Sequence, residues 1–377
     1  MNRSPLRIAM IGHKRIPSRE GGIEVVVEEL SVRLAQAGHD VTVYNRTGHH
    51  VSGRHFISQG SHEKKEYKGV KIRNAFAVHG KGLAAASSSF FATMKALFGR
   101  YDCIHYHAEG PCVMLALPHW LGIRTVATIH GLDWQRSKWN RFAAWYLKLG
   151  EKIAAKYADE VIVLSQNAQR YFEESYGRRT IFIPNGVSRP EIREADVIAR
   201  RWGLEKDSYL FFLSRIVPEK GLAYLIEAFQ KVKTNKKLVI AGGSSDTKGF
   251  FDEMKQLAAE DTRILFTDFV QGRELEELYS NAYVYVLPSD LEGMPLTLLE
   301  AMSYGNCCLV SNIPECTEVV ERKAVVFSKG DVDNLVVKLQ MLCDFEEAVK
   351  HYKGGASYFI CGKYRWDDVV EKTVSLY

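Results

Sequence analysis

The stretch that decides the fold is Ala282-Tyr283-Val284-Tyr285-Val286-Leu287-Pro288, followed closely by Glu292-Gly293-Met294-Pro295-Leu296-Thr297-Leu298-Leu299-Glu300. The first part is an unbroken apolar run, which predicts a buried strand. The second part predicts a helix, because Pro295 suits a first helical turn, where its missing N–H would have no partner anyway. Glu292 then lies in the loop that leaves the strand, and Glu300 lies about one and a half turns into the helix.

The two glutamates flank a position suited to an anion. Gly293 and Met294 offer backbone N–H groups at a helix N-terminus, which favours negative charge. The carboxylates of Glu292 and Glu300 can accept hydrogen bonds from hydroxyl groups. A diphosphate with a sugar on one side and a ribose on the other would fit this pattern. The alternative is that a strand–loop–helix unit carries two glutamates by chance.

A second segment of this type is Leu213-Ser214-Arg215-Ile216-Val217-Pro218-Glu219-Lys220-Gly221. It also runs from a strand into a helix, and ligands of open α/β sheets bind at the carboxyl ends of the strands. Arg215 and Lys220 therefore place two cations where a ligand is expected. Two fixed cations can neutralise a diphosphate leaving group without Mg²⁺. The alternative is that Arg215 pairs with Glu219 on the surface.

Strands alternate with helices through both halves, which predicts an α/β fold of two doubly wound, Rossmann-like domains. The length of 377 residues agrees, because it exceeds one ordinary domain. We place the hinge at Pro184-Asn185-Gly186-Val187, which is rich in turn residues. The predicted domains are 1–188 and 189–355, followed by a last segment, 356–377.

The expected elements follow from hydrophobic periodicity and turn residues. Strands are expected near residues 8–11, 41–44, 70–76, 102–107, 125–129, 160–164, 180–184, 209–214, 237–241, 264–267, 283–287, 307–310 and 324–327. Helices are expected at 23–37 and near 221–233, 248–260, 273–281, 295–304, 331–343 and 364–377.

The composition predicts a reduced, cytoplasmic protein. The seven cysteines show no CxxC or metal-ligand spacing, and Cys103, Cys307 and Cys308 fall in strand-like runs that predict core positions. No N-terminal signal peptide is visible, and no apolar run reaches the roughly 18 residues that a membrane span needs.

Positive charge is concentrated in the first half. Residues 1–188 contain 26 Lys and Arg against 15 Asp and Glu, a net charge of +11, whereas the remainder carries 24 against 30, a net charge of −6. Such asymmetry indicates an anionic partner for the first half. No nucleic-acid-binding signature is present, so an anionic membrane or a lipid-diphosphate acceptor fits better. Segment 134–156 is basic and aromatic, and either lies on a membrane or packs into the core.

Neither metal-like pattern predicts a metal site, and we expect no cofactor. Segment 47–68 is rich in histidine, but without convergent spacing it is typical of a loop. The pattern Asp331-Val332-Asp333 follows Gly330 and opens a helix, where Asp favours the cap. The chain lacks GxGxxG, which disfavours a nicotinamide dehydrogenase.

Two further positions follow strands of the first half. Gly21-Gly22 lies between the first strand and a helix, where glycine lets a backbone approach a ligand closely. His130 ends the strand 125–129, at the edge where ligands of parallel sheets bind. From the sequence alone, a structural role for His130 is as plausible as a functional one. Asp133 lies three residues further along, and Asp is common in turns.

These motifs together resemble the retaining, two-domain GT-B glycosyltransferases of family 4. The glutamate–seven–glutamate motif and the Ser-Arg…Glu-Lys-Gly segment carry the resemblance. The first half is similar to a subgroup that includes bacterial rhamnosyltransferases of surface-polysaccharide assembly, through Gly12-His13-Lys14-Arg15-Ile16-Pro17, Glu20-Gly21-Gly22-Ile23-Glu24 and His130-Gly131-Leu132-Asp133-Trp134. The resemblance implies two domains facing each other across a cleft, with the last helix crossing back to the first domain.

The resemblance also implies roles for the site residues. The catalytic residues would be His130, Arg215, Lys220 and Glu292. The donor-binding residues would be Gly22, Arg215, Lys220, Gly293, Met294, Pro295, Leu296 and Glu300. Asp133 would bind the acceptor. The donor would be a dTDP-, UDP- or GDP-linked sugar, and the acceptor a glycan or a polyprenyl-diphosphate-linked hydroxyl.

In the implied reaction, cations and the helix N-terminus near Met294 stabilise the departing diphosphate, which itself takes the acceptor proton. Glu300 would hold the ribose and Glu292 the sugar hydroxyls. Two other classes remain open: a sugar-nucleotide epimerase of the same shape, and a non-catalytic module that binds nucleotide sugars.

Overall fold

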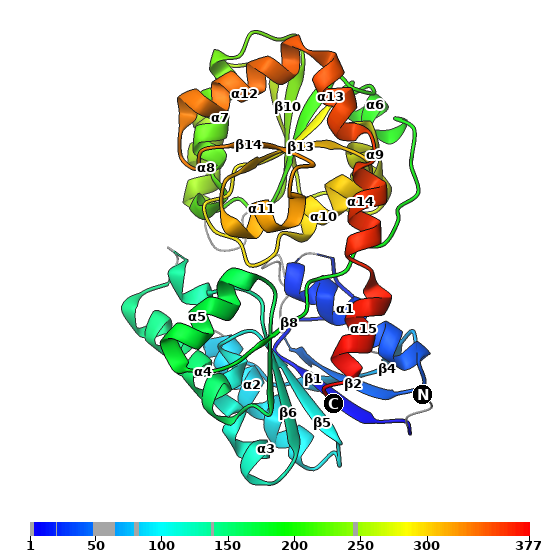
Figure 1. The fold of residues 1–377 in the computed structure, drawn as a ribbon, viewed down its shortest axis with the longest axis vertical. Helices are drawn as coiled ribbons and strands as arrows, with labels where there is room; N and C mark the ends of the chain where they lie inside the picture. The colour runs from blue at the N-terminus through cyan, green and yellow to red at the C-terminus, as the bar shows by residue number, and fades with distance from the viewer. Residues whose placement is uncertain (1–3, 20, 48–64, 79–82, 137–138, 244–247) are drawn as a thin grey trace. The chain divides into compact units, whose positions relative to one another are not determined.

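The computed structural model describes residues 4–19, 21–47, 65–78, 83–136, 139–243 and 248–377. The chain forms two compact units (Figure 1). Unit 1 comprises Met1–Asn185 together with Trp366–Tyr377, and unit 2 comprises Gly186–Arg365. The boundary therefore falls within the turn-rich segment 184–187.

Unit 1 is built on an eight-stranded sheet with the order β3-β4-β2-β1-β5-β6-β7-β8. Its pairs are parallel except β3 with β4. The strands are β1 (Arg7–Ile11), β2 (Asp40–Arg46), β3 (Glu66–Tyr67), β4 (Val70–Ala75), β5 (Cys103–His107), β6 (Arg124–Ile129), β7 (Glu160–Val163) and β8 (Ile181–Phe182). The helices are α1 (Gly22–Gln36), α2 (Leu83–Leu97), α3 (Ala116–Trp120), α4 (Arg141–Tyr157), α5 (Gln166–Tyr176) and α15 (Trp366–Val374).

Helices cover both faces of this sheet, as β1 shows. Ile8 and Met10 pack into a core with residues of α1 and α15. Ala9 and Ile11 face the other way, into a core with residues of α2, α4 and α5. Successive residues of a strand point to opposite faces, so a strand that is apolar on both requires two helical layers. Unit 1 is therefore doubly wound, as the alternation of elements predicts.

Unit 2 is built on a six-stranded parallel sheet with the order β11-β10-β9-β12-β13-β14. The strands are β9 (Tyr209–Leu213), β10 (Lys237–Ala241), β11 (Ile264–Asp268), β12 (Val284–Leu287), β13 (Cys307–Ser311) and β14 (Val325–Phe327). Helices again lie on both sides, with α7, α8 and α12 along one side and α9, α10 and α14 along the other (Figure 1). The helices are α6 (Val197–Trp202), α7 (Leu222–Lys231), α8 (Lys248–Leu257), α9 (Arg273–Asn281), α10 (Leu296–Ser303), α11 (Pro314–Val320), α12 (Val332–Asp344), α13 (Glu346–Lys353) and α14 (Ala356–Lys363).

Local expectations about the core and the caps are confirmed. Cys103, Cys307 and Cys308 are buried and free. The Asp331 side chain accepts a hydrogen bond from the N–H of Asn334 at 2.9 Å, which makes it the N-cap of α12. Asp331 therefore caps a helix, as expected from its place after Gly330. The two-residue β3 was not predicted, because Glu66 and Tyr67 form no apolar run.

The last segment, 356–377, divides between the two units. Its first helix, α14, belongs to unit 2, and only the part from Trp366 onward belongs to unit 1. Within unit 1, α15 lies beside α1 (Figure 1). The Arg33 guanidinium of α1 lies 5.2 Å from the centre of the Trp366 ring, and Val370 and Val374 pack on the core.

Candidate functional site

The carboxyl ends of β9 and β12 mark the point where the strand order of unit 2 reverses. β10, which follows β9 in the chain, pairs with one edge of β9, and β12 pairs with the other. Chain segments leave such a pair of strands in opposite directions, and open α/β sheets bind ligands in the resulting crevice. β9 leads to Arg215 and Lys220, and β12 leads to Glu292. The two segments singled out in the sequence therefore follow neighbouring strands.

Lys220 and Glu292 form an ion pair at this point. Lys220 Nζ lies 2.5 Å from Glu292 Oε1, although the residues are 72 positions apart. Their side chains are only 12% and 9% exposed. Ser289 Oγ donates a hydrogen bond to the same carboxylate oxygen at 2.7 Å. Because both charges have little contact with water, each depends on the other for stabilisation.

Two further contacts tie the loops after β9 and β12 together. The N–H of Asp290 donates to the carbonyl of Glu219 at 2.9 Å. Gly221 has a left-handed conformation, with φ of +68°, and an added Cβ would lie 2.0 Å from the Pro288 carbonyl oxygen. Only glycine permits this approach, so Gly221 helps to hold Lys220 near Glu292.

A third loop of the site was missed in the sequence. Gly242 follows β10 with φ of +136°, and a Cβ there would lie 1.8 Å from the carbonyl oxygen of Ser214. Next to it, the N–H of Ile216 donates to the carbonyl of Gly243 at 3.2 Å. The glycine pair therefore lets the β10 loop support the backbone on either side of Arg215. The signal in the sequence was a Gly-Gly pair directly after a strand.

The helix that carries Glu300 begins one residue later than predicted. Pro295 is the N-cap of α10, with an extended backbone (φ −75°, ψ 101°), so it is not in the first helical turn. Its carbonyl accepts the N–H groups of Leu298 and Leu299, at 3.1 and 3.3 Å. Gly293 and Met294 therefore lie in the loop, and the first backbone N–H groups of the helix itself belong to Leu296 and Thr297.

Glu300 is held by a buried tyrosine. Tyr279 Oη donates to Glu300 Oε2 at 3.1 Å, and its ring stacks on Tyr304 at 5.1 Å. Burial, reinforced by the charge of Glu300, raises the pKa of Tyr279 well above its usual value. The phenol therefore stays protonated and remains a donor that fixes the orientation of Glu300.

Unit 1 has its own reversal of strand order, between β1 and β5. Gly12 follows β1 with φ of +121°, and an added Cβ would lie 2.1 Å from the carbonyl oxygen of His107. Gly22 is the first residue of α1. Two side chains of α1 bind backbone of the segment after Gly12, because Glu24 and Glu28 accept the N–H groups of Lys14 and Ser18, at 2.9 and 3.0 Å. Apart from their helical spacing, nothing in the sequence singles out these two glutamates.

His130, which directly follows β6, belongs to a group with two histidines of the neighbouring strand β5. His130 Nε2 lies 3.1 Å from Nδ1 of His107, which ends β5. The His107 ring stacks on His105 at 4.2 Å. Burial lowers the pKa of His130 to about 4 and that of His105 to about 3, and it lowers the pKa of His107 well below 6.5. All three rings are therefore neutral at pH 7.

Asp133 lies in the turn that follows His130. Its carboxylate is 2.7 Å from the Arg136 guanidinium, and its N–H donates to Glu109 Oε1 at 3.1 Å. Glu109 is fully buried, and burial raises its pKa well above the usual value. The sequence did not single out Glu109, although it follows the strand 103–107 at the same edge of the sheet as His130.

Comparison with known proteins identifies the class of protein to which this chain belongs. Residues 20–189 match the model "Glycosyltransferase Family 4", and residues 195–357 match "Glycosyl transferases group 1". The chain belongs to glycosyltransferase family 4. Residues 1–19, 190–194 and 358–377 lie outside the two matches.

Individual relatives of this glycosyltransferase are distant in sequence. An uncharacterized Bacillus subtilis glycosyltransferase is 29% identical over 56% of this chain and 59% of its own length. The Escherichia coli enzyme UDP-Gal:alpha-D-GlcNAc-diphosphoundecaprenol alpha-1,3-galactosyltransferase is 27% identical over 65% of this chain and 67% of its own. Among solved structures, Anabaena HepE in complex with UDP and glucose aligns over 98% of both chains with a TM-score of 0.80 and 15% identity. The GT-B fold expected from the sequence is confirmed.

The predicted site residues of the glycosyltransferase fall into two groups. Arg215, Lys220, Glu292 and Glu300 lie in unit 2, together with residues 293–295 of the loop and Leu296, the first residue of α10. Gly22, His130 and Asp133 lie in unit 1. Among the residues that the structure describes, no group of three His, Cys, Asp or Glu side chains could hold a metal ion. Most of the histidine-rich segment 47–68 lies outside the described residues.

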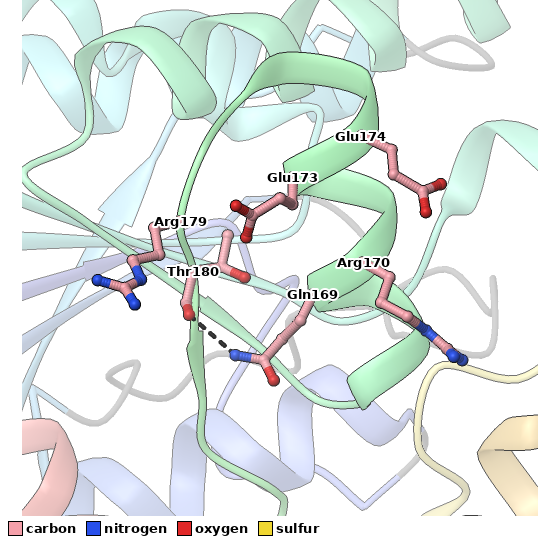
Figure 2. A pocket seen from close by; sticks show the side chains of 6 residues that line it. All are labelled: Gln169, Arg170, Glu173, Glu174, Arg179 and Thr180. Carbon is pink, nitrogen blue, oxygen red and sulfur yellow. Dashed lines mark hydrogen bonds between the residues drawn. The ribbon is translucent and has the colours of Figure 1, made fainter.

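One surface hollow of unit 1 contains none of the predicted site residues. Its volume is about 380 Å³, and it lies between α5 and the chain that leads into β8 (Figure 2). Its lining mixes cations and anions, and Gln169 Nε2 donates to the carbonyl of Thr180 at 2.9 Å. No residue predicted from the sequence lines it.

The aromatic segment of the glycosyltransferase divides between core and surface. Leu147 is buried in α4, whereas Phe142 is 72% exposed and Trp145 is 57% exposed. Lys148 and Lys152 on the same helix are also exposed. Core packing therefore accounts for only part of this segment. No helix within the described ranges is long and apolar enough to span a membrane.

Proposed function

We propose that this glycosyltransferase transfers a sugar, with retention of configuration, from a nucleotide-diphosphate sugar to a hydroxyl of a glycan or lipid-linked acceptor in surface-polysaccharide synthesis. The observation that carries the proposal is the Lys220–Glu292 ion pair at the switch point of unit 2. This ion pair places a cation that can bind a diphosphate next to a carboxylate that can bind sugar hydroxyls.

The chemical roles follow from the charges that develop in the reaction. Bond cleavage leaves a diphosphate and an oxocarbenium-like sugar, so Arg215, Lys220 and the amides that begin α10 stabilise the leaving group. Glu300, oriented by Tyr279, binds the ribose hydroxyls. Glu292 accepts hydrogen bonds from the sugar. The acceptor attacks from the face that the leaving group vacates, and the diphosphate takes its proton.

Relatives support the proposed substrate classes. The Escherichia coli galactosyltransferase is named for a UDP-sugar donor and a diphosphoundecaprenol-linked acceptor. The Anabaena structure contains UDP and glucose. A UDP-, GDP- or dTDP-linked sugar therefore suits the donor site. Rhamnose is the sugar favoured by the motifs of the first half.

A thermal-shift screen of UDP, GDP and dTDP sugars tests the proposal. A donor present at 100 times its dissociation constant adds about 2.7 kcal/mol to the free energy of unfolding. The donor found should then be hydrolysed slowly alone and transferred when an acceptor is added. Conversion without any acceptor requirement would indicate the epimerase instead. Binding without turnover would indicate a non-catalytic module.

We expect activity to be independent of divalent metal ions. Arg215 and Lys220 supply the charge that Mg²⁺ or Mn²⁺ provides elsewhere, so activity in EDTA should equal activity without it. Initial rates with EDTA, and then with Mg²⁺ or Mn²⁺ restored, measure this. An enzyme that is inactive in EDTA and recovers with metal would contradict the role of the two cations.

We further propose that the exposed part of α4 docks unit 1 on an anionic membrane. Phe142 and Trp145 provide apolar contact, and their rings lie 5.8 Å apart. Exposed Arg141, Lys148 and Lys152 provide positive charge on the same helix. A basic helix with exposed aromatic residues favours the interface of anionic lipid.

Vesicle sedimentation should show binding to anionic lipid, to which each engaged Lys or Arg contributes about 1 kcal/mol. This binding should weaken as salt is added. The double variant Phe142→Ser, Trp145→Ser should bind less. Tyr358, which is 81% exposed in unit 2, provides the matched control variant Tyr358→Ser, which should bind like wild type. Equal sedimentation with anionic and neutral vesicles at low salt would rule out the membrane.

A further inference from the structure

The contact between His107 and His130 restricts where the protons of the two rings lie. The 3.1 Å separation of His107 Nδ1 and His130 Nε2 requires one hydrogen between them. A neutral imidazole has one N–H and one bare nitrogen. Whichever ring donates this hydrogen, the tautomers of both rings are then determined.

The surroundings of His107 distinguish the two arrangements. His107 Nε2 is buried and has no hydrogen-bond partner among the described residues. If His130 donated, this nitrogen would carry an N–H without an acceptor in the core. If His107 donates, its Nε2 is a bare nitrogen. Buried N–H groups without an acceptor are rarer in proteins than underused acceptors, so the second arrangement is favoured.

His13, also in unit 1, is a second buried histidine with one nitrogen that carries no hydrogen. Its Nε2 lies 3.0 Å from Asn45 Oδ1, which also accepts the N–H of Ile16, while Asn45 Nδ2 donates to the Ile16 carbonyl. These contacts identify Oδ1 as an acceptor, so His13 Nε2 is the donor. Its unpartnered, buried Nδ1 is therefore bare. Unit 1 thus already contains a buried bare imidazole nitrogen.

We propose that His107 is a positioning residue that holds His130 in the Nδ1–H tautomer, so that His130 offers the substrate a hydrogen-bond donor. Nε2 of His130 accepts from His107, which leaves the Nδ1–H for a substrate oxygen. Burial keeps both rings neutral, so His130 donates as an imidazole without carrying a charge. The role of the donor in turnover rests on the proposed function, whereas the tautomer does not.

The tautomer can be measured without substrate. In two-bond ¹H–¹⁵N spectra of histidine-labelled protein, assigned with a His130→Gln variant, we expect a protonated Nδ1 and a bare Nε2 for His130. This tautomer should be unchanged in His105→Gln. The His105 ring contacts Thr128 and Tyr377, and within the described part of the chain it forms no hydrogen bond with His130. A protonated Nε2 on His130 in the wild type would overturn the proposal.

Two variants of His107 connect the tautomer with activity. His107→Leu removes the donor, so His130 should populate both tautomers, and kcat should fall roughly tenfold to 100-fold with an unchanged KM for the donor. His107→Asn can still donate from its amide and should retain activity within about threefold of wild type. Loss of activity in both variants with an unchanged His130 tautomer would overturn the positioning role. If no nucleotide sugar is turned over by the wild type, the proposed function fails while the spectra still decide the tautomer.

Discussion

Replacing Arg215 or Lys220 with alanine is expected to lower kcat by roughly 10²–10³, the effect of losing one electrostatic stabiliser of a leaving group. Both cations follow β9 at the switch point of unit 2, where a diphosphate would depart. Steady-state rates with a saturating donor measure the effect. An active Arg215→Ala, Lys220→Ala double variant would disprove the assigned roles.

The ion pair requires a control for folding, because Lys220→Ala also leaves the Glu292 carboxylate without its counter-ion. With side chains 12% and 9% exposed, loss of one partner should destabilise unit 2 by about 3 kcal/mol. The double variant Lys220→Met, Glu292→Gln removes both charges, so it should recover stability without activity. Arg201→Ala is the matched surface control, because Arg201 pairs with Glu274 at 2.5 Å between α6 and α9. It should remain fully active.

The second large effect is expected from the two glutamates, which should separate nucleotide binding from sugar binding. Glu300→Ala should raise the Kd of the nucleoside diphosphate roughly tenfold to 100-fold, because hydrogen bonds to a charged group are lost. Glu292→Gln should leave that Kd unchanged and weaken or slow the sugar-bearing donor. Isothermal titration with the nucleoside diphosphate and with the intact donor compares the two.

Tyr279→Phe provides a milder variant with which to compare Glu300→Ala. It removes the 3.1 Å hydrogen bond to Glu300 but keeps the carboxylate. Nucleotide affinity should therefore fall less than in Glu300→Ala. Equal losses for the free nucleotide and the sugar donor in both glutamate variants would contradict the division of roles.

Much of the local structure could be predicted from the chain itself. Apolar runs such as 284–287 and 307–310 identify buried strands, because only a strand covered on both faces is apolar throughout. Asp331 caps α12 as its position after Gly330 predicts. The spacing of Glu292 and Glu300 places one in a loop and the other within a helix. The start of that helix was predicted one residue early, because Pro295 suits both the first turn and the residue before it.

The partners of the site residues could not be predicted in this way. Periodicity identifies a strand but not its neighbour, and the order of strands decides which loops meet. The pairing of β9 with β12 brings Lys220 to Glu292, and that of β5 with β6 brings His107 to His130. The close approach of Gly242 to Ser214 likewise depends on the pairing of β10 with β9.

The sequence by itself determined the α/β class, the two doubly wound halves and the residue types at the carboxyl ends of the strands, because these depend on neighbours within a few positions along the chain. Only the tertiary structure decided that Lys220 and Glu292 share an ion pair, that Tyr279 orients Glu300 and that His107 contacts His130. Each of these depends on contacts between residues 21 to 72 positions apart. Such contacts are set by strand order and by the burial of both partners, which no local pattern records.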